Sequence, residues 1–136
     1  MSIEFWTSQV AAPRRAARQA AEVEGAGWHG IGTVDSQNLS GDPYLFLGLC
    51  ATTTERLGLM TSVTNPVTRH AAVTASSALS VQHLSNGRMV LGIGRGDSAL
   101  AYLGRSPARL AHFEQYLRNV RTYLHGGDVD FDDCHL

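Results

Sequence analysis

Apolar residues gather along the chain in four short runs, and each run is followed by a longer segment with helical character. The runs cover residues 3–7, 30–34, 57–63 and 89–93, and they are apolar almost throughout rather than alternating with polar positions. Continuous short runs of this kind are typical of strands that are buried on both faces. The pattern therefore predicts four buried strands.

The segments between the runs carry the start and stop signals of helices. Pro13 and the pair Asp42-Pro43 are suited to a first helical turn, where the missing N–H of proline costs nothing. We predict helices over 13–25, 43–53, 69–84 and 107–124, of which the first, third and fourth are ended by glycine-containing turns.

Strand and helix thus alternate four times, which indicates an α/β fold with a parallel sheet. Right-handed crossovers leave two outcomes, an open doubly wound sheet or a barrel, and periodicity does not choose between them. A complete (β/α)8 barrel needs roughly 250 residues, so 136 residues would supply a (β/α)4 half. We expect one domain over residues 1–136 that ends in an exposed acidic tail at 128–136.

Composition narrows the class of protein. The net charge is −1 and 43% of the residues are hydrophobic, so bulk electrostatics suggest neither a nucleic-acid partner nor a membrane partner. Cys50 and Cys134 lack the spacing of metal ligands, and we predict no metal site. The first residues lack the features of a signal peptide and no apolar run has membrane-spanning length, so we expect a cytoplasmic protein.

Ligands of parallel α/β proteins bind at the carboxyl ends of the strands. Four polar segments occupy that position here, at residues 8–9, 35–37, 61–65 and 94–98. They form either the rim of one shared pocket or four ordinary surface loops, and we favour the pocket.

The segment from Gly92 to Ser98 has three alternating glycines at a strand end. Glycines let a backbone approach a ligand closely, and Arg95 could contact a phosphate with two nitrogens. Asp97 or Ser98 could instead cap a short helix, and a glycine-rich turn alone is more often structural. Asp35, directly after the second strand, is either a proton-handling group or a turn former.

The order and spacing of several stretches resemble the luciferase-like family of flavin- or deazaflavin-dependent oxidoreductases, particularly its coenzyme F420 branch. The stretches are Asp35-Ser36-Gln37, Thr54-Glu55-Arg56-Leu57-Gly58-Leu59, the run from Ser62 to His70, the run from Leu84 to Asp97, and Asp128-Val129-Asp130-Phe131-Asp132. The resemblance covers essentially the whole chain, with less specific agreement in the first strand and helix.

The resemblance implies a luciferase-like TIM barrel that binds F420 or FMN at its carboxyl rim. In this family the third strand often ends in a cis peptide bond that supports the ring, and the matching bond is Ser62–Val63. The implied catalytic residues are Asp35 and Asp97. The implied cofactor-binding residues are Ser62, Val63, Thr64, Gly94, Arg95, Gly96 and Ser98.

Two departures from the family pattern matter. Ser36 stands where some deazaflavin dehydrogenases have a histidine, so this chain has no histidine for proton transfer at that position. The sequence also ends before strands five to eight, which complete the barrel and the phosphate pocket in the family. A four-stranded half leaves two sheet edges unpaired, so we expect a homo-oligomer or a complementary half-barrel as partner.

The leading functional hypothesis is hydride transfer between reduced F420 or FMN and a small organic substrate. One alternative is FMN-dependent, luciferase-like monooxygenation, which requires a pocket that shields the flavin from water. A second alternative is a truncated half-barrel or binding module without turnover.

Overall fold

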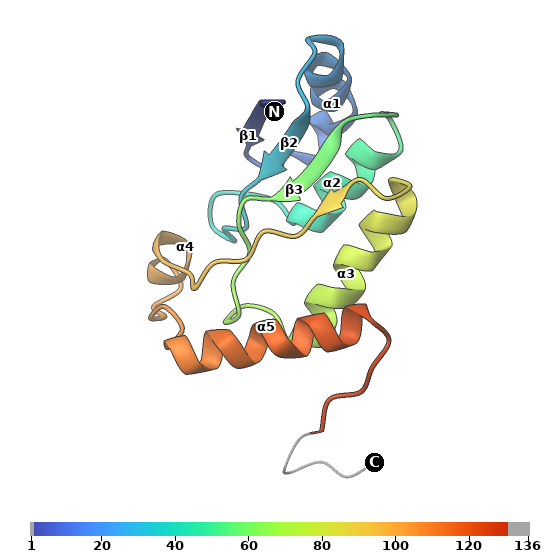
Figure 1. The fold of residues 1–136 in the computed structure, drawn as a ribbon. Helices are drawn as coiled ribbons and strands as arrows, with labels where there is room; N and C mark the ends of the chain where they lie inside the picture. Colours follow the sequence, from blue (N-terminus) through green and yellow to red (C-terminus); the bar gives the residue numbers. More distant parts are fainter. Residues whose placement is uncertain (1, 131–136) are drawn as a thin grey trace.

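Four parallel strands lie side by side in the order in which the chain runs, β1-β2-β3-β4. The computed structural model describes residues 2–130 (Figure 1). The strands are β1 (Trp6–Gln9), β2 (Gly30–Thr33), β3 (Gly58–Thr61) and β4 (Met89–Val90). The helices are a 3-10 turn (Pro13–Arg15), α1 (Ala16–Gly25), α2 (Pro43–Ala51), α3 (Ala71–Leu84), α4 (Ser98–Ala101) and α5 (Leu110–Leu124). The α/β class and the parallel sheet predicted from the sequence are confirmed.

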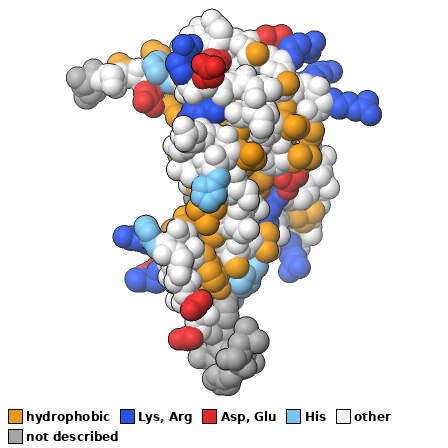
Figure 2. Space-filling view, turned by 90° about the vertical axis from the view of Figure 1, so that its right-hand side faces the viewer, with side chains coloured by type: hydrophobic (Ala, Val, Ile, Leu, Met, Phe, Trp, Pro, Cys, Tyr) orange, Lys and Arg blue, Asp and Glu red, His pale blue; other side chains and the backbone are white. Residues whose placement is uncertain are grey.

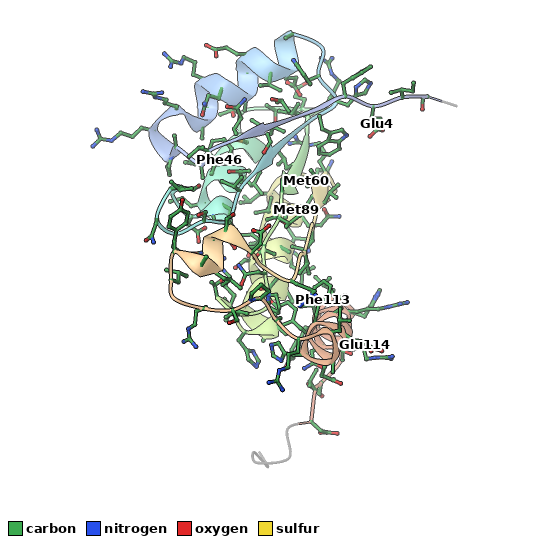
Figure 3. The ribbon with its side chains drawn as sticks, turned by 90° about the vertical axis from the view of Figure 1, so that its left-hand side faces the viewer. Glu4, Phe46, Met60, Met89, Phe113 and Glu114 are labelled. Atoms are coloured by element: carbon green, nitrogen blue, oxygen red, sulfur yellow. The ribbon has the colours of Figure 1, made fainter. Side chains whose placement is uncertain are left out.

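One face of the sheet forms the main core together with α1, α2 and α3 (Figure 1). Successive side chains of a strand point to opposite faces, and Ile31 of β2 and Leu59 of β3 both point to this helix-covered face, where neither is exposed. Phe46 of α2, labelled in Figure 3, is buried in the same cluster. Apolar burial against the helices therefore fixes the register of the strands.

The opposite face of the sheet is lined by small residues around one large ring. The indole of Trp6 in β1 lies so close to Gly30 and Gly58 that a Cβ at either glycine would be within 2.4 Å of it. Further along, Met60 of β3 and Val90 of β4 are partly exposed. The helices that contact the strands all lie on the other side, so this face is open in the described part of the chain.

The outer surface of the helices also carries apolar side chains. Figure 2 shows hydrophobic side chains distributed among polar ones on one such side of the molecule. Leu45 of α2 and Val73 and Leu84 of α3 are each more than half exposed. Scattered exposure of this kind is ordinary for a soluble domain and carries no functional conclusion by itself.

Strand boundaries are where the structure departs from the sequence predictions. The first strand was predicted at residues 3–7 but begins at Trp6, because pairing with β2 starts at Trp6 and Gly30, and Ile3 and Phe5 are exposed. The fourth strand was predicted at 89–93 and is only two residues long. Beyond Val90 the main chain of Gly92 forms two hydrogen bonds of 2.9 Å with the hydroxyl of Thr61, and an isolated bridge joins Ile93 to Thr64.

Two helices begin later than predicted. Helix α3 starts at Ala71, because His70 is extended and accepts a hydrogen bond from the amide of Ala72 as its N-cap. Helix α5 starts at Leu110, because Arg109 is extended. In the predicted acidic tail, Asp128 and Asp130 are exposed, and residues 131–136 lie outside the described residues.

The described residues also allow two negative findings. No helix within residues 2–130 is both long and apolar enough to cross a membrane. Over the same range, no three His, Cys, Asp or Glu side chains gather closely enough to hold a metal ion.

The close approach of β3 to the segment after β4 gives a stability prediction. A Cβ at Gly92 would lie 2.2 Å from the carbonyl oxygen of Thr61, a backbone atom that cannot move aside. We expect Gly92→Ala to destabilise the protein by about 1–3 kcal/mol or more, as other overpacking substitutions do. Urea unfolding measures the change.

The matched control is Gly25→Ala at the end of α1, where a Cβ would meet nothing within 4 Å. It should be neutral or stabilise by roughly 0.5–1 kcal/mol, because alanine favours a helix over glycine. Equal unfolding free energies for the two variants would contradict the close approach.

Candidate functional site

A cavity of about 310 Å³ lies at the carboxyl ends of the strands, between the segments that follow β3 and β4. Its lining includes most of the residues predicted from the sequence: Asp35, Val63, Thr64, Gly94, Arg95, Gly96 and Asp97. Asn65 and Ala99 also line it, whereas the predicted residues Ser62 and Ser98 do not. We call this space the rim cavity.

Val63 forms one wall of the rim cavity. This residue is 50% exposed, and the peptide bond Ser62–Val63 is cis, as the family resemblance implied. The amide of Ser62 donates to the carbonyl of Thr33 over 2.7 Å, which fastens this turn to the end of β2. Ser62 therefore acts on the cavity through the backbone that it anchors.

The glycines of the opposite wall are explained by contacts within the chain. A Cβ at Gly94 would lie 2.9 Å from Cγ2 of Val63, and one at Gly96 would lie 2.2 Å from Leu100. Gly96 also has a φ of +86°, which favours glycine. Of the two interpretations given to this segment, the structural one accounts for each glycine, and the backbone still borders the cavity.

Arg95 and Asp97 both have partners within their own loop. The Nε of Arg95 donates to the carbonyl of Ala108 over 2.7 Å, and the amide of Ala108 donates back to the carbonyl of Arg95 over 3.0 Å. The terminal nitrogens of Arg95 take no part in this pair. Asp97 is the N-cap of α4 and accepts from the amide and the hydroxyl of Ser98. The predicted capping of a short helix is thus present.

Asp35 is almost completely buried beneath the cavity, with a side chain that is 1% exposed. One carboxylate oxygen accepts from the side-chain Nε2 of Gln37 over 2.7 Å. The other accepts from the hydroxyl of Thr64 over 2.6 Å and from the guanidinium of Arg69. The structure therefore surrounds Asp35 with donors from its own loop and from the segment after β3.

Arg69 is the partner that sequence reasoning missed. Its Nη1 bonds Asp35 and its Nη2 bonds Asp42 over 2.6 Å, while its guanidinium lies 5.2 Å from the ring centre of Tyr44. The available signal was topological, because a basic residue after β3 and an acidic residue after β2 belong to neighbouring segments of one rim. We call Asp35, Asp42, Tyr44, Thr64 and Arg69 the Asp35–Arg69 cluster.

Burial shapes the protonation of this cluster. Burial alone would lower the pKa of the Arg69 guanidinium, but the carboxylates of Asp35 and Asp42 outweigh it and raise this pKa above its ordinary value. Burial raises the pKa of Tyr44 to about 12, with Arg69 partly offsetting the effect. The cluster therefore holds a permanent cation beside a neutral phenol at physiological pH.

A larger cavity of about 620 Å³ lies at the opposite, amino ends of the strands. Two of its charged lining residues form hydrogen bonds with backbone groups. Glu24 accepts from the backbone amides of residues 55–57, and Arg88 donates to backbone carbonyls, including those of Leu57 and Ala51. Trp6 occupies its inner side. The rim cavity is the better candidate site despite its smaller volume, because ligands of parallel α/β proteins bind at the carboxyl ends of the strands.

A parallel sheet with polar side chains gathered at the carboxyl ends of its strands is the arrangement of (β/α)-barrel enzymes. The luciferase-like monooxygenase family matches residues 3–136, and the chain belongs to this family.

Two curated relatives illustrate the range of the family. The 5,10-methylenetetrahydromethanopterin reductase of Methanolobus tindarius is 40% identical over 111 residues, which are 80% of this chain and 34% of the relative. The 4-hydroxyprotoasukamycin monooxygenase of Streptomyces nodosus subsp. asukaensis is 37% identical over 89 residues, which are 64% of this chain and 22% of the relative.

A solved structure shows the same fold. The coenzyme F420-dependent tetrahydromethanopterin reductase of Methanopyrus kandleri superposes with a TM-score of 0.84 at 23% identity, over 97% of this chain and 43% of that chain. The chain thus spans less than half the length of these proteins. It has the fold of a (β/α)4 half of a luciferase-like barrel, as the sequence predicted.

The Asp35–Arg69 cluster contains its own matched comparison, because Arg69 pairs with one buried and one half-exposed carboxylate. Asp35→Asn should destabilise the protein by about 3–5 kcal/mol, since it leaves a buried guanidinium without its main counter-charge. Asp42→Asn should cost less than about 1 kcal/mol, because the Asp42 side chain is 49% exposed and asparagine also caps helices.

Urea unfolding of the two variants at neutral pH measures the difference. Equal losses would contradict the burial-based ranking of the two ion pairs.

Proposed function

We propose that the protein is an oxidoreductase in which the rim cavity holds the redox ring of coenzyme F420 beside a small organic substrate. The observation that carries the proposal is the rim cavity itself, which brings together the residues implied by the family resemblance. Its volume of about 310 Å³ falls within the range of small-molecule pockets. A putative coenzyme F420-dependent oxidoreductase of Mycobacterium tuberculosis, 31% identical over 124 residues, supports F420 in preference to FMN.

The lining of the cavity suits a flat ring with a polar edge. Val63 offers an exposed apolar wall, and the backbone from Gly94 to Asp97 offers polar groups on the opposite side. When bound, the ring cofactor supplies the hydride transfer. The protein would orient the ring between these walls and exclude water from it.

Individual roles follow from the positions of the residues. Val63 and Thr64 would support the ring, with Ser62 holding their backbone in place. Gly94, Arg95 and Gly96 would border the ring or the substrate, where the terminal nitrogens of Arg95 suit an anionic group. Asp97 would accept a hydrogen bond at the reacting centre, and Ser98 would support Asp97 through their mutual hydrogen bond.

A second candidate is FMN-dependent monooxygenation, which the 37% identical monooxygenase relative favours. The two functions are separated by titrating the chain with F420 and with FMN while ring absorbance is recorded. Tighter binding of F420 supports hydride transfer, and tighter binding of FMN supports the monooxygenase. Binding of a ring without turnover would favour a binding module.

A large side chain introduced into the rim cavity tests directly whether the ring binds there. Ala99 lines the rim cavity, and Ala101 lies in the same short helix α4 but is exposed and does not line the cavity. We expect Ala99→Trp to abolish ring binding, because an indole would fill the space, and Ala101→Trp to bind like the natural chain. The binding titration above measures both, and equal affinities would contradict the location of the site.

We propose further that additional βα units complete this half-barrel, supplied by a second copy or by a complementary half. The open sheet face with Trp6 and the edges at β1 and β4 support this, because unpaired strand edges and open apolar surface favour association. Sedimentation of the 136-residue chain should show concentration-dependent association. A monodisperse, well-folded monomer at every concentration would contradict it.

A further inference from the structure

Arg69 does not line the rim cavity, yet it is joined to both walls of the cavity through two intervening residues. We propose that Arg69 is a positioning residue: its ion pair with Asp35 holds Thr64, and Thr64 sets the spacing between Val63 and the Gly94 segment. The consequence for cofactor binding rests on the proposed function. The effect of Arg69 on the position of Thr64 rests on the contacts alone.

The first step is the need of Asp35 for a counter-charge. A carboxylate with 1% exposure is costly to bury unless it is paired and hydrogen-bonded. Gln37 and Thr64 supply neutral donors, and Arg69 supplies the positive charge. Asp35 therefore keeps its orientation only while Arg69 is in place.

Thr64 connects Asp35 to the two walls of the cavity. The hydroxyl of Thr64 donates to the same Asp35 oxygen that Arg69 bonds. The backbone of Thr64 is fixed in turn to the opposite wall, because its amide donates to Gly92 over 3.0 Å and its carbonyl accepts from Gly94 over 2.8 Å. Since Thr64 directly follows Val63, its position determines the distance between the two walls.

Arg69 is itself held in place by Asp42 and Tyr44. Its side chain is only 15% exposed, and its second terminal nitrogen bonds Asp42 at the start of α2. The ring of Tyr44 covers the guanidinium at 5.2 Å. A planar guanidinium can bond two carboxylates in fixed directions and stack on a ring, which a lysine ammonium cannot do. The site therefore requires arginine rather than a positive charge alone.

The inference changes the role expected for Asp35. Both of its oxygens are occupied within the chain, and one of them faces a guanidinium. Asp35 then acts as the anchor of Thr64, and the carboxylate exposed at the cavity is that of Asp97.

The test uses the 136-residue chain with five single variants and one double variant. Thr64→Val removes the hydroxyl at constant shape, and Thr64→Ser retains it. Arg69→Met removes the charge. Arg69→Lys retains the charge but lacks the planar guanidinium with its two terminal nitrogens. Arg18→Met is the matched control, because Arg18 lies in an exposed pair with Glu22 in α1. The double variant combines Thr64→Val with Arg69→Met.

The first readout is amide hydrogen exchange at Gly94, whose amide bonds the carbonyl of Thr64. Thr64→Val and Arg69→Met should each speed this exchange by about tenfold, the effect of losing one hydrogen bond to a charged group. Thr64→Ser and Arg18→Met should match the natural chain, and Arg69→Lys should lie between. The amide of Ala26, at the end of α1, serves as the internal reference.

Coupling separates positioning from general loss of stability. If both residues act through Asp35, the double variant should exchange at Gly94 about as fast as the faster single variant. Additive effects, or unchanged exchange in Thr64→Val, would overturn the inference. If Arg69→Met does not fold, Arg69→Lys carries the same test, and natural exchange at Gly94 in that variant overturns it.

The second readout is the affinity and absorption spectrum of bound F420. Thr64→Val and Arg69→Lys should weaken binding by roughly tenfold and shift the ring absorption, whereas Arg18→Met should do neither. Thr64→Ser should recover most of the affinity that Thr64→Val loses. If the natural chain binds no ring, the proposed function fails, and the positioning role is still decided by Gly94 exchange. Faster exchange with natural affinity and spectrum would overturn the link to the cofactor.

Discussion

The buried carboxylate of Asp35 is the constraint on which the carboxyl end of the sheet depends. A charge with so little exposure must find donors and a counter-charge, and here they come from Gln37, Thr64 and Arg69. Arg69 in turn bonds Asp42 at the start of α2. One ionic cluster thereby joins segments that follow β2 and β3 and fixes the turn that forms a cavity wall.

The two ends of the sheet serve different purposes. At the amino end, Trp6 packs over glycines and Arg88 satisfies backbone carbonyls, so that end contributes stability. At the carboxyl end, Val63 and Asp97 are presented to an open cavity. This division matches the general behaviour of (β/α) barrels, in which chemistry occupies the carboxyl face and the amino face stabilises the fold. Membership of the luciferase-like monooxygenase family accords with it.

The sequence predicted those features that depend on local pattern. Parallel strands followed from apolar runs separated by helices, and the rim residues followed from their place after each strand. The predicted boundaries were wrong where tertiary contacts decided them: Phe5 is apolar but precedes the first strand pair, Trp6 with Gly30, and beyond Val90 an isolated bridge between Thr64 and Ile93 takes the place of a continued strand. Arg69 was missed because its partner Asp35 lies 34 residues away, and such pairing leaves no periodic signal.

The most direct test of the account is to map where a redox ring binds, using amide chemical shifts of the isotope-labelled chain during titration with F420. The account predicts that the largest changes fall on Val63, Thr64 and the segment from Gly94 to Asp97. Changes centred on Trp6, His29 and Met89, at the opposite end of the sheet, would contradict it.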